Sequence, residues 1–449
     1  MNNFFGSIWW LIVSLGVLVT FHEFGHFWVA RRFGVKVLRF SVGFGRPLWL
    51  RRGRDGTEYV IAAIPLGGYV KMLDEREGDV DAADVSQAFN RKSVGRRIAI
   101  VAAGPLANVL LCVALLWAML VIGRPDYAPV VGHIEGIAAQ SHLMRGDTLL
   151  SVDDRQTPTW SEAALALATA AIDRKDVRVH VRTAQDADAT RTLRLSQLPA
   201  GFDEMRALQF IGLTPRHQLL PPLVGRIEPG SAAWGLLAEG DRVTAIDGAP
   251  VPAFEDIGPL VQKIGGRTAM IEVDRDGERL ALEITPKQRT EPQRGQYWAL
   301  GIGPAPAAVP PYDAKLQFGP IAAVPAALRD TWKLTRDSVG MIGRLLSGHA
   351  SAGNVSGPIT IARYANASAQ LGTAWFLNFL ALMSLSLAII NILPIPVLDG
   401  GHLLYYLIEL AKGSPLSEHA MAAGQYVGLA LLAGLMGLAF YNDILQLLP

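Results

Sequence analysis

Hydrophobic residues in this chain gather in four long runs, separated by segments in which polar residues return. The runs lie near residues 4–30, 98–122, 374–397 and 421–440. Each is long enough for the roughly 20 helical residues that cross a bilayer. No Lys or Arg precedes the first run, and the run is too long for a signal peptide, so we expect it to remain as a membrane helix. The pattern predicts a polytopic α-helical membrane protein with four transmembrane helices.

Basic residues are concentrated in the loop between the first two runs, residues 31–97. Loops of this kind stay on the cytoplasmic side of bacterial membranes. The long segment from about residue 123 to 373 then lies on the opposite face, together with both termini. The basic residues of this loop, many of them close to helix ends, include Arg31, Arg32, Arg51, Arg52, Arg54, Arg91, Lys92, Arg96 and Arg97.

The overall composition agrees with a membrane protein. Half of the 449 residues are hydrophobic and only 18% are charged, which is more apolar than most soluble enzymes. The formal net charge is +1, so the chain offers no broad cationic face and nucleic acid is excluded as a partner. The single cysteine, Cys112, cannot form an intrachain disulfide.

An internal repeat with a period of about 93 residues occupies the segment between the second and third runs. The first copy contains Pro129-Val-Val-Gly-His-Ile-Glu and then Gly146-Asp147. The second contains Pro222-Leu-Val-Gly-Arg-Ile-Glu and then Gly240-Asp241. Each copy predicts a strand, a short helix, a Gly-Asp turn, a strand, a hairpin, a longer helix and further strands.

This repeated pattern resembles the PDZ domain, with copies at 123–213 and 214–305. PDZ domains bind peptides by adding a strand to a sheet edge, although two small domains acting as spacers are the alternative. The first copy departs from the pattern at Asp153-Asp154, where the second keeps an Asp-Gly turn. Residues 306–373 are predicted to form an amphipathic connecting segment that lies on the membrane surface.

The first hydrophobic run contains the motif Phe21-His22-Glu23-Phe24-Gly25-His26. Histidines at i and i+4 project from one helix face, so both ring nitrogens can bind one Zn²⁺. Glu23 is rotated by roughly 100° from His22 and falls beside the metal, where it can serve as a general base. Ionisable residues are costly inside a membrane and are seldom found there without a function.

A third metal ligand is expected from the third hydrophobic run, which ends in Asn391-Ile-Leu-Pro-Ile-Pro-Val-Leu-Asp399-Gly400-Gly401. The prolines must interrupt the helix there. Asp399 would be an isolated carboxylate in the membrane unless it met a cation, but His402 is chemically an equal candidate. Asn391 could donate a hydrogen bond to the substrate carbonyl or make a helix contact.

At this point the sequence resembles the site-2 protease family of intramembrane zinc metalloproteases. The resemblance covers nearly the whole chain. It rests on the histidine motif, the Asn391-to-Gly400 block, the tandem repeats, and the blocks Val42-Gly-Phe-Gly-Arg-Pro47, Ile64-Pro-Leu-Gly-Gly-Tyr-Val-Lys71 and Gly104-Pro-Leu-Ala-Asn108.

The resemblance implies a set of site residues. It assigns one Zn²⁺ to His22, His26 and Asp399, and catalysis to Glu23. Residues 37–71 are implied to form a β-hairpin that dips into the membrane from the cytoplasmic side. The hairpin would present an edge strand to a locally unwound substrate, because lipid cannot satisfy the freed backbone groups. Substrate contact is expected at Asn391, Gly43, Phe44, Gly45, Gly67 and Gly68.

The family further implies regulated intramembrane proteolysis in the bacterial inner membrane. The implied substrates are single-span membrane proteins, namely an anti-sigma factor of the envelope stress response and remnant signal peptides. The implied domains are 1–122 with the first two helices, the two PDZ domains, the connecting segment, and 374–449 with the last two helices. The PDZ domains and both termini would be periplasmic and the active site near the cytoplasmic side.

Two other classes of protein compete with a protease. A membrane scaffold would use the PDZ repeats to bind protein tails and leave the metal site inert, but such a protein has no need for Glu23 beside the histidines. A metal transporter would place ligands on several crossings, whereas the six remaining histidines lie outside the hydrophobic runs.

Overall fold

Four helices of the computed structural model are long and apolar enough to cross a membrane, as predicted: Phe4–Arg32, Val94–Ile122, Thr373–Ile392 and Glu418–Leu445. The third is shorter than its hydrophobic run. It ends at Ile392 because Pro394 and Pro396 cannot continue a helix. The structure describes residues 2–76, 78–199, 201–291, 295–348, 351–445 and 447.

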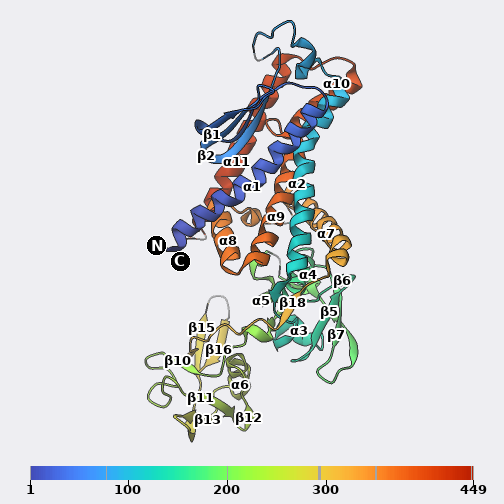
Figure 1. Cartoon of the computed structure of the whole chain (residues 1–449). Helices are drawn as coiled ribbons and strands as arrows, with labels where there is room; N and C mark the ends of the chain where they lie inside the picture. The colour runs from blue at the N-terminus through green and yellow to red at the C-terminus, as the bar shows by residue number, and fades with distance from the viewer. Residues whose placement is uncertain are drawn as a thin grey trace. The chain divides into compact units, whose positions relative to one another are not determined.

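Residues 1–124 and 317–449 form one compact unit, and Pro125–Leu316 form a second. In the first unit, α1 (Asn2–Arg32) and α9 (Thr373–Ile392) both pack along α2 (Val94–Ile122) (Figure 1). A methyl group on Gly25 of α1 would lie 2.2 Å from the carbonyl oxygen of Ala103 in α2. The missing side chain therefore permits a close approach of the two helix backbones.

The remaining helices of this unit complete the bundle around α2. The helix α10 (Asp399–Lys412) packs on α2 and α9, and α11 (Glu418–Leu445) contacts α8 (Pro358–Gln370). α1 begins and α11 ends on the same side of the unit (Figure 1). Two short 3-10 turns, Val85–Gln87 and Phe89–Arg91, precede α2, and a third lies at Ala352–Asn354.

The connecting segment contains two helices, α7 (Pro320–Leu346) and α8. α7 packs along the carboxyl-terminal half of α2, where the indole nitrogen of Trp117 donates a hydrogen bond to the Pro320 carbonyl oxygen at 2.9 Å. Further along, Cys112 Sγ lies 3.8 Å from Thr331 Oγ1. One face of α7 is therefore covered by α2, and the amphipathic, surface-lying character expected of this segment stays a prediction.

Residues 37–72 form a hairpin of two long bent strands, β1 (Val37–Arg52) and β2 (Glu58–Met72). Each strand bends, so the pair makes four antiparallel runs. Phe40 is paired with both Tyr59 and Val70, and Leu50 is paired with Val60. β1 bends where Gly43 and Gly45 have φ angles of 95° and 86°, values that favour glycine. Residues 68–72 form one outer run, and β2 packs against α1.

The second unit contains two copies of one topology, as the repeat predicts. The first copy has a sheet of order β6-β5-β7-β8 with a separate β4-β9 pair, and the second has β12-β11-β13-β14 with a β10-β17 pair. The first copy comprises β4 (Val131–Ile134), α3 (Gly136–Gln140), β5 (Thr148–Val152), β6 (Arg155–Gln156), α4 (Trp160–Ile172), β7 (Val177–Arg182), β8 (Asp188–Leu193), α5 (Ala207–Ile211) and β9 (Leu213–Pro215).

The second copy has counterparts of the strands of the first copy and of its longer helix α4, and it has one additional strand pair. These are β10 (Val224–Ile227), β11 (Arg242–Ile246), β12 (Ala249–Pro250), α6 (Ile257–Ile264), β13 (Ala269–Arg275), β14 (Glu278–Ile284), the extra pair β15 (Lys287–Glu291) and β16 (Gly295–Ala299), and β17 (Ile302–Pro304). The short strands β3 (Arg124–Asp126) and β18 (Ala314–Leu316) lie at the two ends of the repeat segment.

Each copy builds its own core from alternating side chains. In β7, Val177, Val179 and Val181 are buried while the residues between them are exposed, as expected for a strand with one covered face. One expectation was wrong. The second copy has turns, not a short helix, between β10 and β11. Gly230 and Gly235 in that stretch have φ angles of 71° and 78°, which are incompatible with a right-handed helix.

Candidate metal centre

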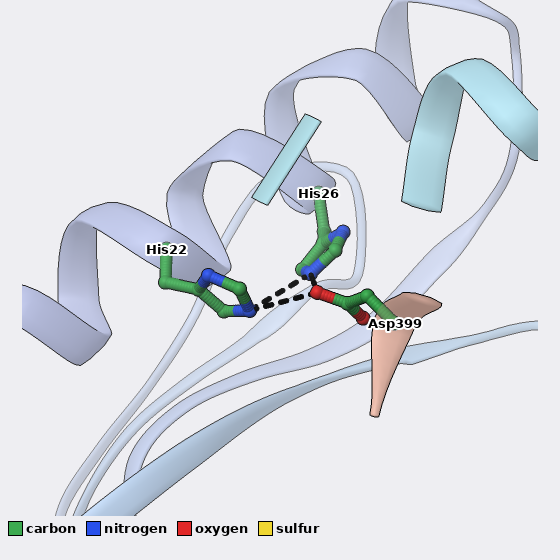
Figure 2. Close-up of side chains that lie close together, drawn as sticks. All are labelled: His22, His26 and Asp399. Atoms are coloured by element: carbon green, nitrogen blue, oxygen red, sulfur yellow. Dashed lines mark hydrogen bonds and ion pairs between the residues drawn. The ribbon is translucent and has the colours of Figure 1, made fainter. Parts of the chain in front are cut away.

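His22 and His26 project from the same face of α1, one helical turn apart. Both residues are buried, each 8% exposed, and their Nε2 atoms are 3.3 Å apart. Figure 2 shows the two rings turned toward a common point. The i, i+4 spacing therefore places both rings on one face of the helix, as expected from the sequence.

The carboxylate of Asp399 enters the same space from the first residue of α10. Its Oδ2 lies 3.1 Å from His22 Nε2 and 3.4 Å from His26 Nε2 (Figure 2). The preceding loop turns sharply, and Val397 has a φ angle of 89°. Gly400 packs against the carbonyl groups of Ile392 and Leu393, so the start of α10 fits tightly against the end of α9.

These three residues fit a zinc ion. Tetrahedral ligands at the usual Zn–N and Zn–O distances lie about 3.3 Å from one another, close to the three separations of 3.1, 3.3 and 3.4 Å. Asp399 Oδ2 is buried and has no hydrogen bond of good geometry within the described part of the chain. Two imidazoles and a carboxylate are also a ligand set that suits zinc.

The competing ligand, His402, is not in this group. Within the described residues, the ligand atoms of His22, His26 and Asp399 all lie within 4.8 Å of one another, and His402 does not join them. Its ring packs edge-on against Tyr405, with centroids 6.2 Å apart. The spacing of three residues cannot separate Asp399 from His402, but in the folded chain it is the Asp399 side chain that α10 brings to the histidine pair.

α2 orients both histidines from the side opposite the metal. The Nδ1 of His26 donates a hydrogen bond to the Ile100 carbonyl oxygen at 2.9 Å. The side-chain amide of Asn108, which is fully buried, lies 3.4 Å from the Nδ1 of His22. Turning this amide places Oδ1 where it can accept the Nδ1 proton. Both rings are thereby held with Nε2 available for a metal.

Gly104 provides the space in which the histidine rings lie. A methyl group at this position would approach His26 Nε2 to 2.2 Å and His22 Cε1 to 2.9 Å. The sequence assigned no individual role to Gly104 or Asn108. Their spacing of four residues, which puts them on one face of α2, was the available signal.

Glu23 lies between the histidines and the hairpin. A methyl group on Gly68 would come within 3.1 Å of Glu23 Cγ and 2.9 Å of Val19 Cγ1. The outer run of the hairpin, residues 68–72, is thus adjacent to the acidic group nearest the metal ligands.

The other residues expected to contact substrate belong to the hairpin and to the end of α9. Gly67 packs against the ring of Phe44, whose ring in turn stacks on Tyr69 with centroids 6.1 Å apart. Gly43 and Gly45 form the bend in β1. Asn391 is half-buried near the end of α9, and none of its contacts within the described residues connects it to the metal ligands.

Comparison with known proteins agrees with this chemistry. The profile of peptidase family M50 matches residues 10–435. A protein of Xylella fastidiosa described as "Putative zinc metalloprotease" is 57% identical, covering 99% of this chain and 100% of its own length. The regulator of sigma-E protease RseP of Escherichia coli is 42% identical, and the match covers all of both chains.

A solved PDZ domain of an SdrC-like protein from Listeria innocua aligns with 20% of this chain and 99% of its own. The identity is 19% and the TM-score is 0.18, which is too low to assign the fold of that segment. The family profile and the full-length relatives are decisive, and they agree with the resemblance seen in the sequence. The chain belongs to peptidase family M50, the site-2 proteases, and is a bacterial inner-membrane zinc metalloprotease.

Proposed function

We propose that this protease cleaves peptide bonds within the transmembrane segments of single-span membrane proteins. In this proposal His22, His26 and Asp399 hold one zinc ion and Glu23 is the general base. The observation that carries it is the triangle of buried ligand atoms, with sides of 3.1 to 3.4 Å, beside a carboxylate in a membrane-spanning helix. In a chain of a peptidase family, a hydrolytic site of this kind within a membrane-spanning helix supports a peptide bond in the membrane as its target.

The proposed chemistry divides between the metal and the chain. Zinc, when bound, supplies Lewis-acid polarisation and makes water more acidic. Glu23 takes the proton from the attacking water and passes it to the amine that leaves. Ile100 and Asn108 keep the histidines oriented during these steps. Asn391 would donate a hydrogen bond to the scissile carbonyl, which requires it to approach the site when substrate is bound.

The hairpin supplies a second part of the proposal. A helical substrate hides its carbonyl groups in its own hydrogen bonds, so it must unwind before water can attack. The outer run at residues 68–72 is paired on one side only, with residues 37–42. Its position beside Glu23 supports a role in pairing with the unwound segment. Gly43, Phe44, Gly45, Gly67 and Gly68 would shape this binding edge.

The remaining expectations concern orientation, domains and partners. The shared topology of the two copies supports two PDZ domains, at 123–213 and 214–305, with periplasmic placement following from the basic loop between the first two helices. The family supports an anti-sigma factor and remnant signal peptides as substrates. The PDZ pair would then exclude proteins that retain bulky periplasmic domains.

One variant tests the mechanism directly. The full-length chain in detergent, supplied with a single-span model substrate, should lose at least a hundredfold in cleavage rate on Glu23→Gln while keeping its zinc. Undiminished cleavage by this variant would show that Glu23 is not the general base. A parent chain that cleaves no substrate would leave the alternative, a catalytically inert PDZ scaffold. Asp399→Ala should lose both zinc and activity, and His402→Ala should retain both. The reverse pattern would make His402 the third ligand.

A further inference from the structure

A buried ion pair joins α2 to the far end of α10. The guanidinium of Arg97 donates two hydrogen bonds to the Glu409 carboxylate, at 2.7 and 3.1 Å. The two side chains are 10% and 13% exposed. Arg97 also donates to the Lys92 carbonyl oxygen and lies 4.8 Å from the ring centroid of Tyr406. These contacts hold the Arg97 guanidinium in one position, and the Glu409 carboxylate balances its charge.

The helix that carries Arg97 also orients a metal ligand. Ile100, three residues further along α2, accepts the hydrogen bond from His26. α10 starts at Asp399, beside His26, and reaches Glu409, beside Arg97. α10 therefore meets the histidines of α1 at its start, and near its end it meets α2 through this ion pair.

The loop that delivers Asp399 is conformationally strained. Val397, two residues before the ligand, has a φ angle of 89°. A β-branched residue rarely adopts this value. Such conformations persist only where surrounding contacts enforce them. The loop alone would tend to relax and move the start of α10, so something beyond the loop must hold that helix in place.

We propose that Arg97 and Glu409 are positioning residues that hold α10 against this strain and keep Asp399 within reach of the metal. The inference rests on the proposed assignment of Asp399 as a zinc ligand. Neither side chain touches the ligands; they act through the helix that lies between. An ion pair that served stability alone would change unfolding without changing the metal site.

The experiment compares zinc release from full-length variants into an excess of a coloured chelator. Glu409→Gln and Arg97→Gln should each release zinc about ten to a hundred times faster than the parent chain, the range typical of residues that support metal ligands. The Co²⁺-substituted variants should show a shifted d–d absorption band. With a model substrate, kcat should fall while KM changes little.

Two further variants keep the test decisive. A single change leaves a buried unpaired charge that could unfold the chain, whereas Arg97→Gln combined with Glu409→Gln removes both charges. This folded double variant should still release zinc quickly. Adding Val397→Gly to the double variant removes the strain and should restore zinc retention.

Arg91→Gln, which breaks an exposed ion pair with Glu75, is the matched control and should leave zinc release and the Co²⁺ spectrum unchanged.

The outcomes separate this inference from the proposed function. If the folded double variant retains zinc and the Co²⁺ spectrum of the parent, the positioning role is wrong while the zinc site stands. If Val397→Gly fails to restore retention, the pair does not act against strain at that residue. If Asp399→Ala itself retains zinc, the ligand assignment fails.

Discussion

The Nδ1 of His26 is held by the Ile100 carbonyl oxygen at 2.9 Å, across the interface between the first two membrane helices. Because the acceptor is a backbone atom, no side-chain substitution on α2 removes this contact directly. His22 differs, since its Nδ1 faces the side chain of Asn108. The two histidines are therefore oriented by different kinds of group. A single side-chain substitution can remove the contact between Asn108 and His22, but not the one between Ile100 and His26.

We expect Asn108→Leu to weaken zinc binding by about ten- to a hundredfold, because His22 loses the group that fixes its ring. Zinc retention against a chelator measures the change. Asn442→Leu is the matched control. Asn442 is also a buried asparagine and donates to the carbonyl groups of Ala352 and Val355, on α11. It should lower stability and leave zinc retention unchanged, and equal zinc loss in both variants would contradict the prediction.

Gly104→Ala should abolish zinc binding and proteolysis. The added methyl group would lie 2.2 Å from the His26 Nε2 atom, so the ring must leave its position. Zinc content by mass spectrometry is the measurement. Gly95→Ala, in the same helix, adds a methyl group with nothing within 4 Å and should be tolerated. A zinc-loaded, active Gly104→Ala protein would show that the rings do not occupy this space in the working enzyme.

Asp443→Leu should destabilise the helical unit without altering the metal site. Its carboxylate accepts hydrogen bonds from the backbone amides of Gly357 and Ile359 and from the hydroxyl of Thr360, at 2.6 to 3.0 Å. Leaving such buried donors unpaired costs about 1–3 kcal/mol. Thermal unfolding in detergent measures the loss. Glu418→Gln changes an exposed charge on the same helix, and a comparable loss there would refute the prediction.

The stability of the second repeat should depend on pH through Asp241. Hydrogen bonds from Arg275, at 2.7 and 2.8 Å, hold the pKa of this carboxyl below its usual value, against the opposing effect of burial. The folded state therefore gains stability above the unfolded pKa of about 3.9. That gain is lost as the pH falls through the lower folded value.

Calorimetry of the full chain at several pH values tests this. Arg275→Gln should lower the transition temperature of the repeat unit at pH 6, and the difference from the parent should shrink below pH 4. Among the described residues, Arg182, the corresponding residue of the first repeat, forms ion pairs with the exposed Asp186 and Asp188 alone. Arg182→Gln should have little effect at any pH, and a pH-independent effect of Arg275→Gln would contradict the role of Asp241.

The parts of this structure that follow a local pattern could be predicted from the sequence. The hydrophobic runs predicted the four helices that could cross a membrane, and the i, i+4 spacing predicted that the rings of His22 and His26 lie together. The repeated Gly-Asp blocks gave two copies of one topology. Each of these depends on residues close together in the chain, or on comparison of two stretches of it.

The parts that depend on contacts between distant elements could not be predicted in the same way. Nothing local distinguishes Asn108 from an asparagine at any helix contact, or pairs Arg97 with Glu409. The choice of Asp399 over His402 depends on how a loop with a left-handed valine turns. The missing helix of the second repeat reflects glycines whose φ angles depend on their tertiary setting.

The metal centre also constrains how the protein is made. His22 and His26 belong to the first helix, and Asp399 follows the third. At bacterial synthesis rates of about 5–20 residues per second, tens of seconds separate their emergence from the ribosome. During that interval the membrane holds the histidines and Glu23 without Asp399, the third ligand of the proposed site. Under this proposal the zinc site of a nascent chain is incomplete, and the enzyme becomes competent to cut only after its last membrane segments are in place.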